Sequence, residues 1–223
     1  MRTLTRLEAR VLGVLVEKAL TVPDSYPLSL NTLTLGCNQK TARAPVMNAS
    51  EADVQAAIDA LRSLHLVIES SGSRVLRYEH NMGRTLALPS QSVALLAVLM
   101  LRGPQTTPEL RANSERLHRF ADASSVDAFL DELASRSTEK GGPLVVKLAR
   151  APGAREPRWA HLLCGDAELA ALGGRDAGDA SAGGVAGEDT ADWRAAHDAL
   201  HREVTELRAA VERLYRELGV ARD

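Results

Sequence analysis

The sequence predicts a mainly α-helical fold with small β-hairpin wings (α+β), built as two tandem winged-helix domains plus a C-terminal heptad helix. Three observations predict it. The order helix, helix, helix, hairpin occurs twice within the first 164 residues. Aromatic residues make up only 3% of the chain, so Leu, Val and Ala must fill the core, which suits helices. Beyond residue 190, apolar residues recur at heptad spacing.

Two helices are predicted at the start of the chain, the first from its capping residues and both from apolar residues that face inward. Thr5 and Glu8 have the spacing of a capping box, and apolar residues then recur at helical spacing to about Leu20. The proline-containing stretch "TVPDSYP" ends this helix. A second, short helix is expected from about Ser29, with its apolar residues facing inward: Leu30, Leu33 and Cys37.

A third helix and a hairpin complete the first unit. Ser50 is the expected N-cap, and one helical face is apolar: Val54, Ala57, Ile58, Leu61 and Leu64. Residues 66–69 and 74–79 are rich in β-formers and flank the turn "SSGS". This order is the winged-helix pattern, a helix-turn-helix unit followed by a β-hairpin wing, and it places the first domain at residues 1–86.

The same order of elements follows in residues 87–164. Ser90 opens a helix that "RGPQ" interrupts, and Thr107 is expected to cap a short helix with Pro108 at its first position. Ser124 or Ser125 begins the next helix. Two further β-rich runs, 144–149 and 158–163, flank "RAPGAREP" as a longer wing. These residues form the second predicted domain.

The rest of the chain is expected to contain a linker and a dimerisation helix. Residues 165–190 are rich in Gly, Ala and Asp, which is typical of a flexible linker. Residues 191–219 have Val at two of the four a positions and Leu at three of the four d positions, which favours a parallel two-stranded coiled coil and a homodimer, although His197 at another a position weakens one layer. The alternative is a helix that folds back on the domains. The expected seam is Trp193, Leu200, Val204, Leu207, Val211, Leu214 and Leu218.

Two stretches resemble the signature regions of the YceH-like bacterial proteins. They are "VEKALTVPDSYPLSLNTLTLGCNQKTARAPVM" and "LMLRGPQTTPELRANSERLHRF". The resemblance covers about residues 3–163 and implies a pair of winged-helix domains, usually with a heptad-rich C-terminal helix. The family has no established function and implies no catalytic or binding residues. It usually carries an acidic residue between Arg43 and Pro45, where this chain has Ala44, so no salt bridge inside that loop is expected.

The charge distribution argues against a dedicated, strongly basic nucleic-acid binder. Residues 1–88 have a net charge of +2, residues 89–166 of +1 and residues 167–223 of −5. The outward positions of the third helix of each unit are mostly acidic, which disfavours insertion into the major groove.

The candidate nucleic-acid contacts therefore lie outside the third helices. They are the polar and basic residues of the loop after the second helix, the first wing, and the second unit's short helix and its exit: Asn38, Gln39, Lys40, Arg43, Arg74, Arg77, Arg111, Arg116 and Arg119. The alternative is structural. Cations just past a helix C-terminus interact favourably with its dipole, and arginines near glutamates form ion pairs on a solvated face.

These patterns predict a non-enzymatic binding protein, a regulator-like DNA-binding or nucleoprotein factor. The alternative is a dimeric protein–protein adaptor with no DNA contact. No catalytic residues, metal site or cofactor are expected: His197 and His201 are four residues apart but lack a third ligand. With two distant cysteines and no apolar run long enough for a membrane span, we expect a cytoplasmic protein.

Overall fold

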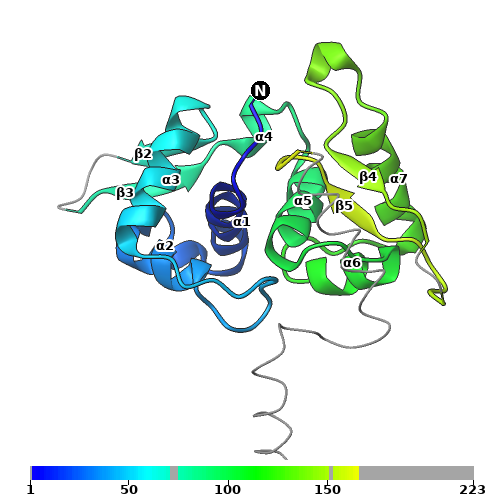
Figure 1. The fold of residues 1–223 in the computed structure, drawn as a ribbon, viewed down its shortest axis with the longest axis horizontal. Coiled ribbons are helices and arrows are strands. Elements are labelled where there is room, and N and C mark those ends of the chain that lie inside the picture. The colour runs from blue at the N-terminus through cyan, green and yellow to red at the C-terminus, as the bar shows by residue number, and fades with distance from the viewer. Residues whose placement is uncertain (1, 71–74, 151–152, 166–223) are drawn as a thin grey trace, which may run out of the picture. The chain divides into compact units, whose positions relative to one another are not determined.

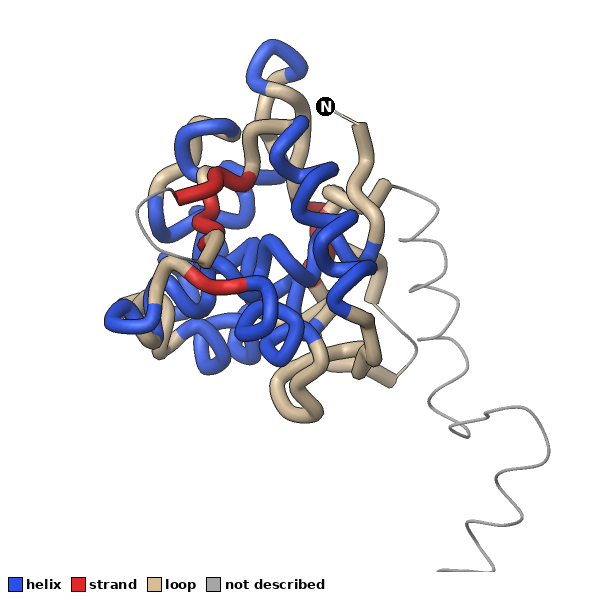
Figure 2. The backbone as a smooth tube through the Cα atoms, turned by 90° about the vertical axis from the view of Figure 1, so that its left-hand side faces the viewer, coloured by secondary structure: helices blue, strands red, loops and turns tan. Residues whose placement is uncertain are grey.

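The computed structural model describes residues 2–70, 75–150 and 153–165, and Figure 1 shows its fold. It is a mixed α+β structure in which helices predominate and the strands are short (Figure 2). The first half contains α1 (Arg6–Thr21), the 3-10 turn Pro23–Ser25, β1 (Leu28–Ser29), α2 (Leu30–Cys37), α3 (Glu51–Ser63), β2 (Val67–Ser70), β3 (Arg77–His80) and α4 (Met82–Thr85). The second half contains α5 (Ser90–Arg102), α6 (Thr107–Ser114), α7 (Ala123–Ala134), the 3-10 turn Thr138–Lys140, β4 (Val145–Lys147) and β5 (Trp159–His161).

The starts of α1, α2 and α3 follow from local capping; the sequence predicted the caps of α1 and α3 and the approximate start of α2. The Thr5 hydroxyl accepts the Glu8 amide at 3.1 Å, and the Glu8 carboxylate accepts the Thr5 amide at 2.9 Å, closing the capping box of α1. Ser29 caps α2, and Ser50 caps α3 through a reciprocal pair with Asp53. Each cap satisfies backbone donors that the first turn would leave unpaired.

Two predicted helix starts in the second half were wrong by one or two residues. The N-cap of α6 is Thr106 rather than Thr107, because Glu109 stands three residues after Thr106 and completes the capping box. The last helix begins at Ala123, since the Asp122 carboxylate accepts the Ser125 amide at 2.8 Å. Asp is as good an N-cap as Ser, so the acidic residue defines the start.

The sheets are antiparallel, and the first contains a strand that the sequence did not reveal. Its order is β1-β3-β2, with Leu28 opposite Tyr78 and Val67 opposite His80. The second sheet pairs β4 with β5. Gln105, just before α6, bridges to Trp159 on β5, as β1 before α2 pairs with β3. The two halves therefore share strand placement as well as helix order.

Helix α1 is buried on more than one side. The expected apolar stripe included Val11, Val14 and Leu15, but Leu12 and Val16 are also fully buried, because α3 and α5 both pack on α1. A continuous apolar run is typical of a helix that is covered all round. The buried side chains of both halves form one cluster. The division into domains at residue 86 stays a prediction.

Helices α1 and α5 approach each other closely at a glycine. A Cβ on Gly13 of α1 would lie 3.0 Å from Cγ of Leu101 on α5, so a larger residue would push the helices apart. Figure 1 shows the two helices side by side in the centre of the described residues. Among those residues, none of the helices is long and apolar enough to span a bilayer.

Candidate nucleic-acid interface

Residues 38–49, the loop between α2 and α3, are held in place by a buried arginine. The Arg43 side chain has no solvent exposure. Its guanidinium donates to both carboxylate oxygens of Glu17 on α1, at 3.2 and 2.6 Å, and to the Gln39 side-chain oxygen at 2.7 Å. It also donates to the carbonyls of Gly36 and Ala42. Arg43 thus joins the loop to α1, and Gln39 is one of its partners within the loop.

Three further contacts anchor the same loop. Asn38 donates to the Ala49 carbonyl and accepts the Ala49 amide, both at 2.8 Å, which closes the loop across its base. The guanidinium of Arg10, itself buried, donates to the carbonyls of Cys37 and Pro45 at 3.0 and 2.7 Å. The Ala44 amide donates to the Leu101 carbonyl at the end of α5. The loop therefore links the two halves.

The ionisation of Glu17 reflects these contacts. Burial would raise its pKa, but the hydrogen bonds and positive charge of Arg43, with a smaller effect of Lys18, hold the pKa below its usual value. Burial, together with the nearby charge of Arg43, lowers the pKa of Arg10. Glu17 was absent from the sequence-based candidates, because 26 residues separate it from Arg43 and nothing local links the two.

Of the four candidates in this loop, Lys40 is the exposed one. The structure brings Asn38, Gln39 and Arg43 together as internal bonding groups, so the long loop is explained by its attachment to α1 and α5. Lys40 remains available to a partner.

The first hairpin, β2–β3, exposes apolar side chains directly before β3. Arg77 is only partly exposed and donates to the Pro27 carbonyl at 2.8 Å. Its neighbour Tyr78 is 2% exposed and points inward, with its hydroxyl donating to the Gln55 side chain. Val75 and Leu76 are 57% and 55% exposed. Arg74 lies outside the described residues.

Helix α3 has the acidic surface that the sequence indicated. Its exposed residues include Glu51, Asp53 and Asp59. The one arginine of this helix, Arg62, forms ion pairs with Asp59 and with Glu69 on β2, at 3.6 and 2.9 Å. Its positive charge is therefore offset locally, and α3 offers little attraction to phosphate.

The three arginines around α6 have different surroundings, although all are exposed. Arg111 donates to the Ala121 carbonyl at 3.0 Å, and Arg119 forms an exposed ion pair with Glu115 at 3.4 Å. Arg116 lines a cavity with residues of α1 and α5 and makes no ion pair with the described residues. Of the three, Arg116 is thus the one that lines this cavity.

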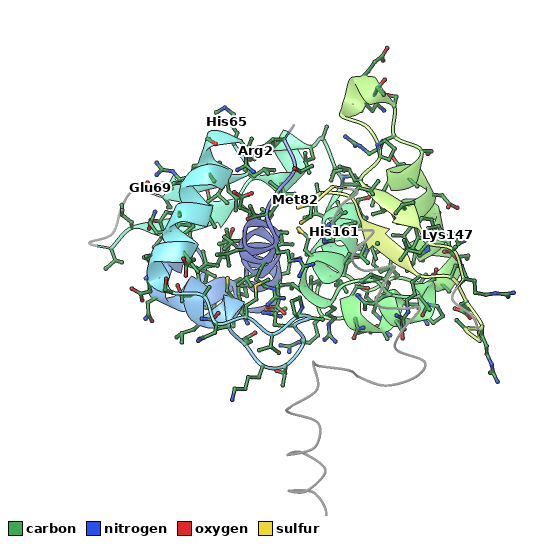
Figure 3. All side chains as sticks on the ribbon, viewed as in Figure 1. Arg2, His65, Glu69, Met82, Lys147 and His161 are labelled. Atoms are coloured by element: carbon green, nitrogen blue, oxygen red, sulfur yellow. The ribbon has the colours of Figure 1, made fainter. Side chains whose placement is uncertain are left out.

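A group of exposed cations lies on the second hairpin, β4–β5. Between residues 147 and 158 the chain carries four basic residues and one acidic residue, Glu156, and all five are exposed. The basic residues are Lys147, Arg150, Arg155 and Arg158. The sequence analysis predicted the turn of a wing here and did not include these basic residues among the candidate contacts, although their clustering is visible in the sequence. Figure 3 shows Lys147 on the opposite side of the described residues from Glu69 of the first hairpin.

The root of this hairpin is rigidly packed. Trp159 is 1% exposed, its indole N–H donates to the Thr107 hydroxyl at 3.3 Å, and the Lys147 ammonium lies 5.1 Å from its ring centroid. The backbone bridge between Gln105 and Trp159 fixes the hairpin to the start of α6. The exposed cations of this hairpin, which precede Trp159 in the chain, are therefore attached to a well-packed base.

Helix α7 adds an acidic surface beside this basic one. Asp131 and Glu132 are exposed, and Asp127 accepts the Thr107 hydroxyl at 2.6 Å. Both third helices are thus acidic, as predicted.

The expected dimerisation residues, from Trp193 to Leu218, lie outside the described residues. Within the described part of the chain, no group of three or more His, Cys, Asp or Glu is arranged to hold a metal ion.

The fold and surface define a class: a small, mainly helical α+β protein with two antiparallel hairpins and no metal cluster among the described residues. The chain belongs to the family described as "Protein of unknown function, DUF480", whose model matches residues 4–154. It is 62% identical over 222 residues to a UPF0502 protein of Leptothrix cholodnii, covering 100% of this chain and 98% of that protein. A UPF0502 protein of Burkholderia multivorans is 60% identical over 223 residues, covering 100% and 92%. The family expected from the sequence is confirmed.

Proposed function

We propose that this protein is a non-enzymatic DNA-binding or nucleoprotein factor with two winged-helix domains, which contacts the phosphate backbone mainly through the second hairpin. The observation that carries the proposal is the group of exposed cations between residues 147 and 158. Exposed Lys and Arg side chains neutralise phosphates and release counterions, which supplies most sequence-independent affinity for DNA. We also propose that the protein is cytoplasmic.

The acidic helices limit how DNA approaches. Asp131 and Glu132 on α7 would repel phosphates flanking the major groove, so α7 is a poor recognition helix. Contact through the hairpin keeps the backbone near the cations and away from those carboxylates. The start of α6 adjoins the hairpin root, and two further exposed cations lie around this helix: Arg111, and Arg119, which is paired with Glu115.

A salt titration of DNA binding tests this proposal. The affinity of the full chain for a short fluorescent duplex is measured by anisotropy at several salt concentrations. Four phosphate contacts predict a slope of log affinity against log salt of about −3.6, and affinities in the micromolar range or weaker. Changing Arg150→Glu together with Arg155→Glu should reduce the slope by about two units and weaken binding at least tenfold.

The matched control carries the same change of charge elsewhere. Arg84→Glu with Lys140→Glu alters two exposed cations on α4 and on the 3-10 turn after α7, outside the hairpin. This variant should bind nearly as well as the original chain. No binding at low salt would refute the proposal, and so would equal weakening by both double variants.

A second function, a dimeric protein–protein adaptor, is favoured by the first hairpin. Val75 and Leu76 directly before β3 and Ile68 on β2 are 57%, 55% and 38% exposed, and the neighbouring Glu69 is acidic. Exposed apolar groups of this kind occur at protein-binding surfaces. A pull-down with the full chain and a Leu76→Ser variant tests it: the adaptor function requires one stoichiometric protein that the original chain recovers and the variant does not.

A further inference from the structure

A polar cavity lies where three helices end. Its volume is about 210 Å³, far more than the roughly 15 Å³ that a single buried water needs. It is lined by the last turns of α1 and α5 and the residues after α6, with Ala42 of the 38–49 loop at its wall. The lining residues are Glu17, Lys18, Thr21, Val22, Ala42, Val98, Leu101, Arg102, Asn113, Arg116 and Leu117.

The charges around this cavity do not balance. Lys18, Arg102 and Arg116 line it against a single carboxylate, Glu17, which is already bonded to Arg43. Lys18 lies 3.5 Å from the same carboxylate. Arg102 and Arg116 make no ion pair with the described residues. Because the Glu17–Arg43 pair is neutral as a unit, the three lining cations give the cavity a positive excess.

The C-terminal ends of the three helices partly offset the positive charge of the lining cations but do not neutralise it. The carbonyl ends of α1, α5 and α6 converge here, and each helix C-terminus carries the equivalent of about half a negative charge. Each of the three cations carries a full charge. The partial charges therefore lower the cost of placing cations together while a positive excess remains for a ligand.

We propose that this cavity binds a small oxyanion with two or more negative charges, a phosphate-bearing compound or a polycarboxylate. Arg102 and Arg116 each offer a planar guanidinium, which pairs with phosphate or carboxylate oxygens through two parallel hydrogen bonds. Lys18 adds a compact charge, and Asn113 lines the cavity as a neutral polar group. The cavity is too small for duplex DNA, so this site is separate from the second hairpin and does not rest on DNA binding.

Such a ligand would join the two halves. Lys18 belongs to the first half and Arg102 and Arg116 to the second, so an anion held by all three would cross-link α1 with α5 and the α6 exit. The ligand would bind the folded protein and not the unfolded chain, and so raise thermal stability with the logarithm of its concentration once that exceeds the dissociation constant.

Calorimetric titration of the full chain tests the site. The probes are inorganic pyrophosphate and citrate, at constant ionic strength with sodium chloride as the background salt; their relative affinities distinguish the phosphate from the carboxylate source. At least one should bind saturably at one site per chain and raise the melting temperature. Arg102→Gln and Arg116→Gln should each weaken binding about tenfold or more, because each removes a charge-assisted contact. Arg84→Gln, an exposed cation that does not line the cavity, should leave binding unchanged.

The outcomes separate this inference from the proposed function. Saturable binding of either probe that depends on Arg102 and Arg116 supports the cavity even if the chain fails to bind DNA. No saturable heat with either probe overturns it, whatever the DNA result. Binding that Arg84→Gln weakens as much as Arg116→Gln also overturns it, since the attraction would then reflect overall charge.

Discussion

Replacing Arg43 by methionine should destabilise the protein strongly, because it removes the charge that accompanies a largely buried carboxylate. The Arg43 side chain is 0% exposed and that of Glu17 is 16% exposed. The substitution deletes every guanidinium hydrogen bond of Arg43 and leaves Glu17 without its main partner. Removing one member of a buried ion pair typically costs about 3–5 kcal/mol, and we expect a loss in that range at neutral pH.

The loss of stability in Arg43→Met should also change with pH, and the pKa of Glu17 determines the direction of that change. In the original chain the pKa of Glu17 is lowered, so its contribution is complete above the ordinary value of 4.5 and is lost as pH falls. In Arg43→Met burial is no longer opposed by Arg43, so the pKa of Glu17 should rise. Protonation of Glu17 then removes the uncompensated buried charge of the variant as the pH approaches 4.5. The deficit relative to the original chain should therefore shrink between neutral pH and pH 4.5.

Urea denaturation followed by circular dichroism at both pH values measures the effect. The control is Arg119→Met, which removes an ion pair whose side chains are 86% and 55% exposed and should cost less than about 1 kcal/mol. The double variant Glu17→Met with Arg43→Met should recover part of the loss, because no buried charge is left alone. A loss below about 1 kcal/mol in Arg43→Met, or a deficit that grows on acidification, would refute the reasoning.

Three further predictions concern packing, thiol reactivity and assembly. In Gly36→Ala the new Cβ would lie 2.6 Å from Cγ1 of Val14, so thermal denaturation should show a loss of about 1–3 kcal/mol, partly restored by adding Val14→Ala. In a Cys164→Ser background, Cys37 should react with a thiol reagent only after denaturation, because its side chain is buried and burial raises its pKa to about 12; rapid reaction of the native protein would contradict this. If the heptad seam forms a dimer, light scattering should give twice the 23.9 kDa of one chain, and Leu207→Asp with Leu214→Asp should halve that mass; a monomeric original chain would exclude the dimer.

The elements that the sequence predicted correctly depend on neighbours in the chain. Thr5 and Ser50 define helix starts through residues three positions away, and apolar spacing does the same for the buried faces. The two hairpins were recognised because β-rich runs flank turn residues. The two-residue strand β1 was missed, since a strand that short has no pattern of its own and exists only through pairing with β3.

The candidate site was predicted less well, for a physical reason. A polar residue in a loop has the same appearance in a sequence whether it faces solvent or a buried partner. Arg43 was predicted to contact phosphate, but its partner Glu17 is 26 residues away, and burial of the pair depends on how the loop packs on α1. In the second hairpin the cations were visible in the sequence, and the packing of Trp159 against Thr107 supplied the fixed base.

The two hairpins occupy equivalent places in the two halves yet carry different chemistry. The two halves share their helix order, and each hairpin also pairs with a segment that precedes the second helix of its half. These segments are Leu28 and Ser29 in the first half and Gln105 in the second. The first hairpin exposes Val75 and Leu76 directly before β3, whereas the second carries four cations against one carboxylate. Both third helices are acidic, so neither half favours base reading in the major groove. A protein of this design would hold DNA through its backbone with the second hairpin and leave the first free for an apolar surface on another protein, so the two proposed functions are compatible on one chain.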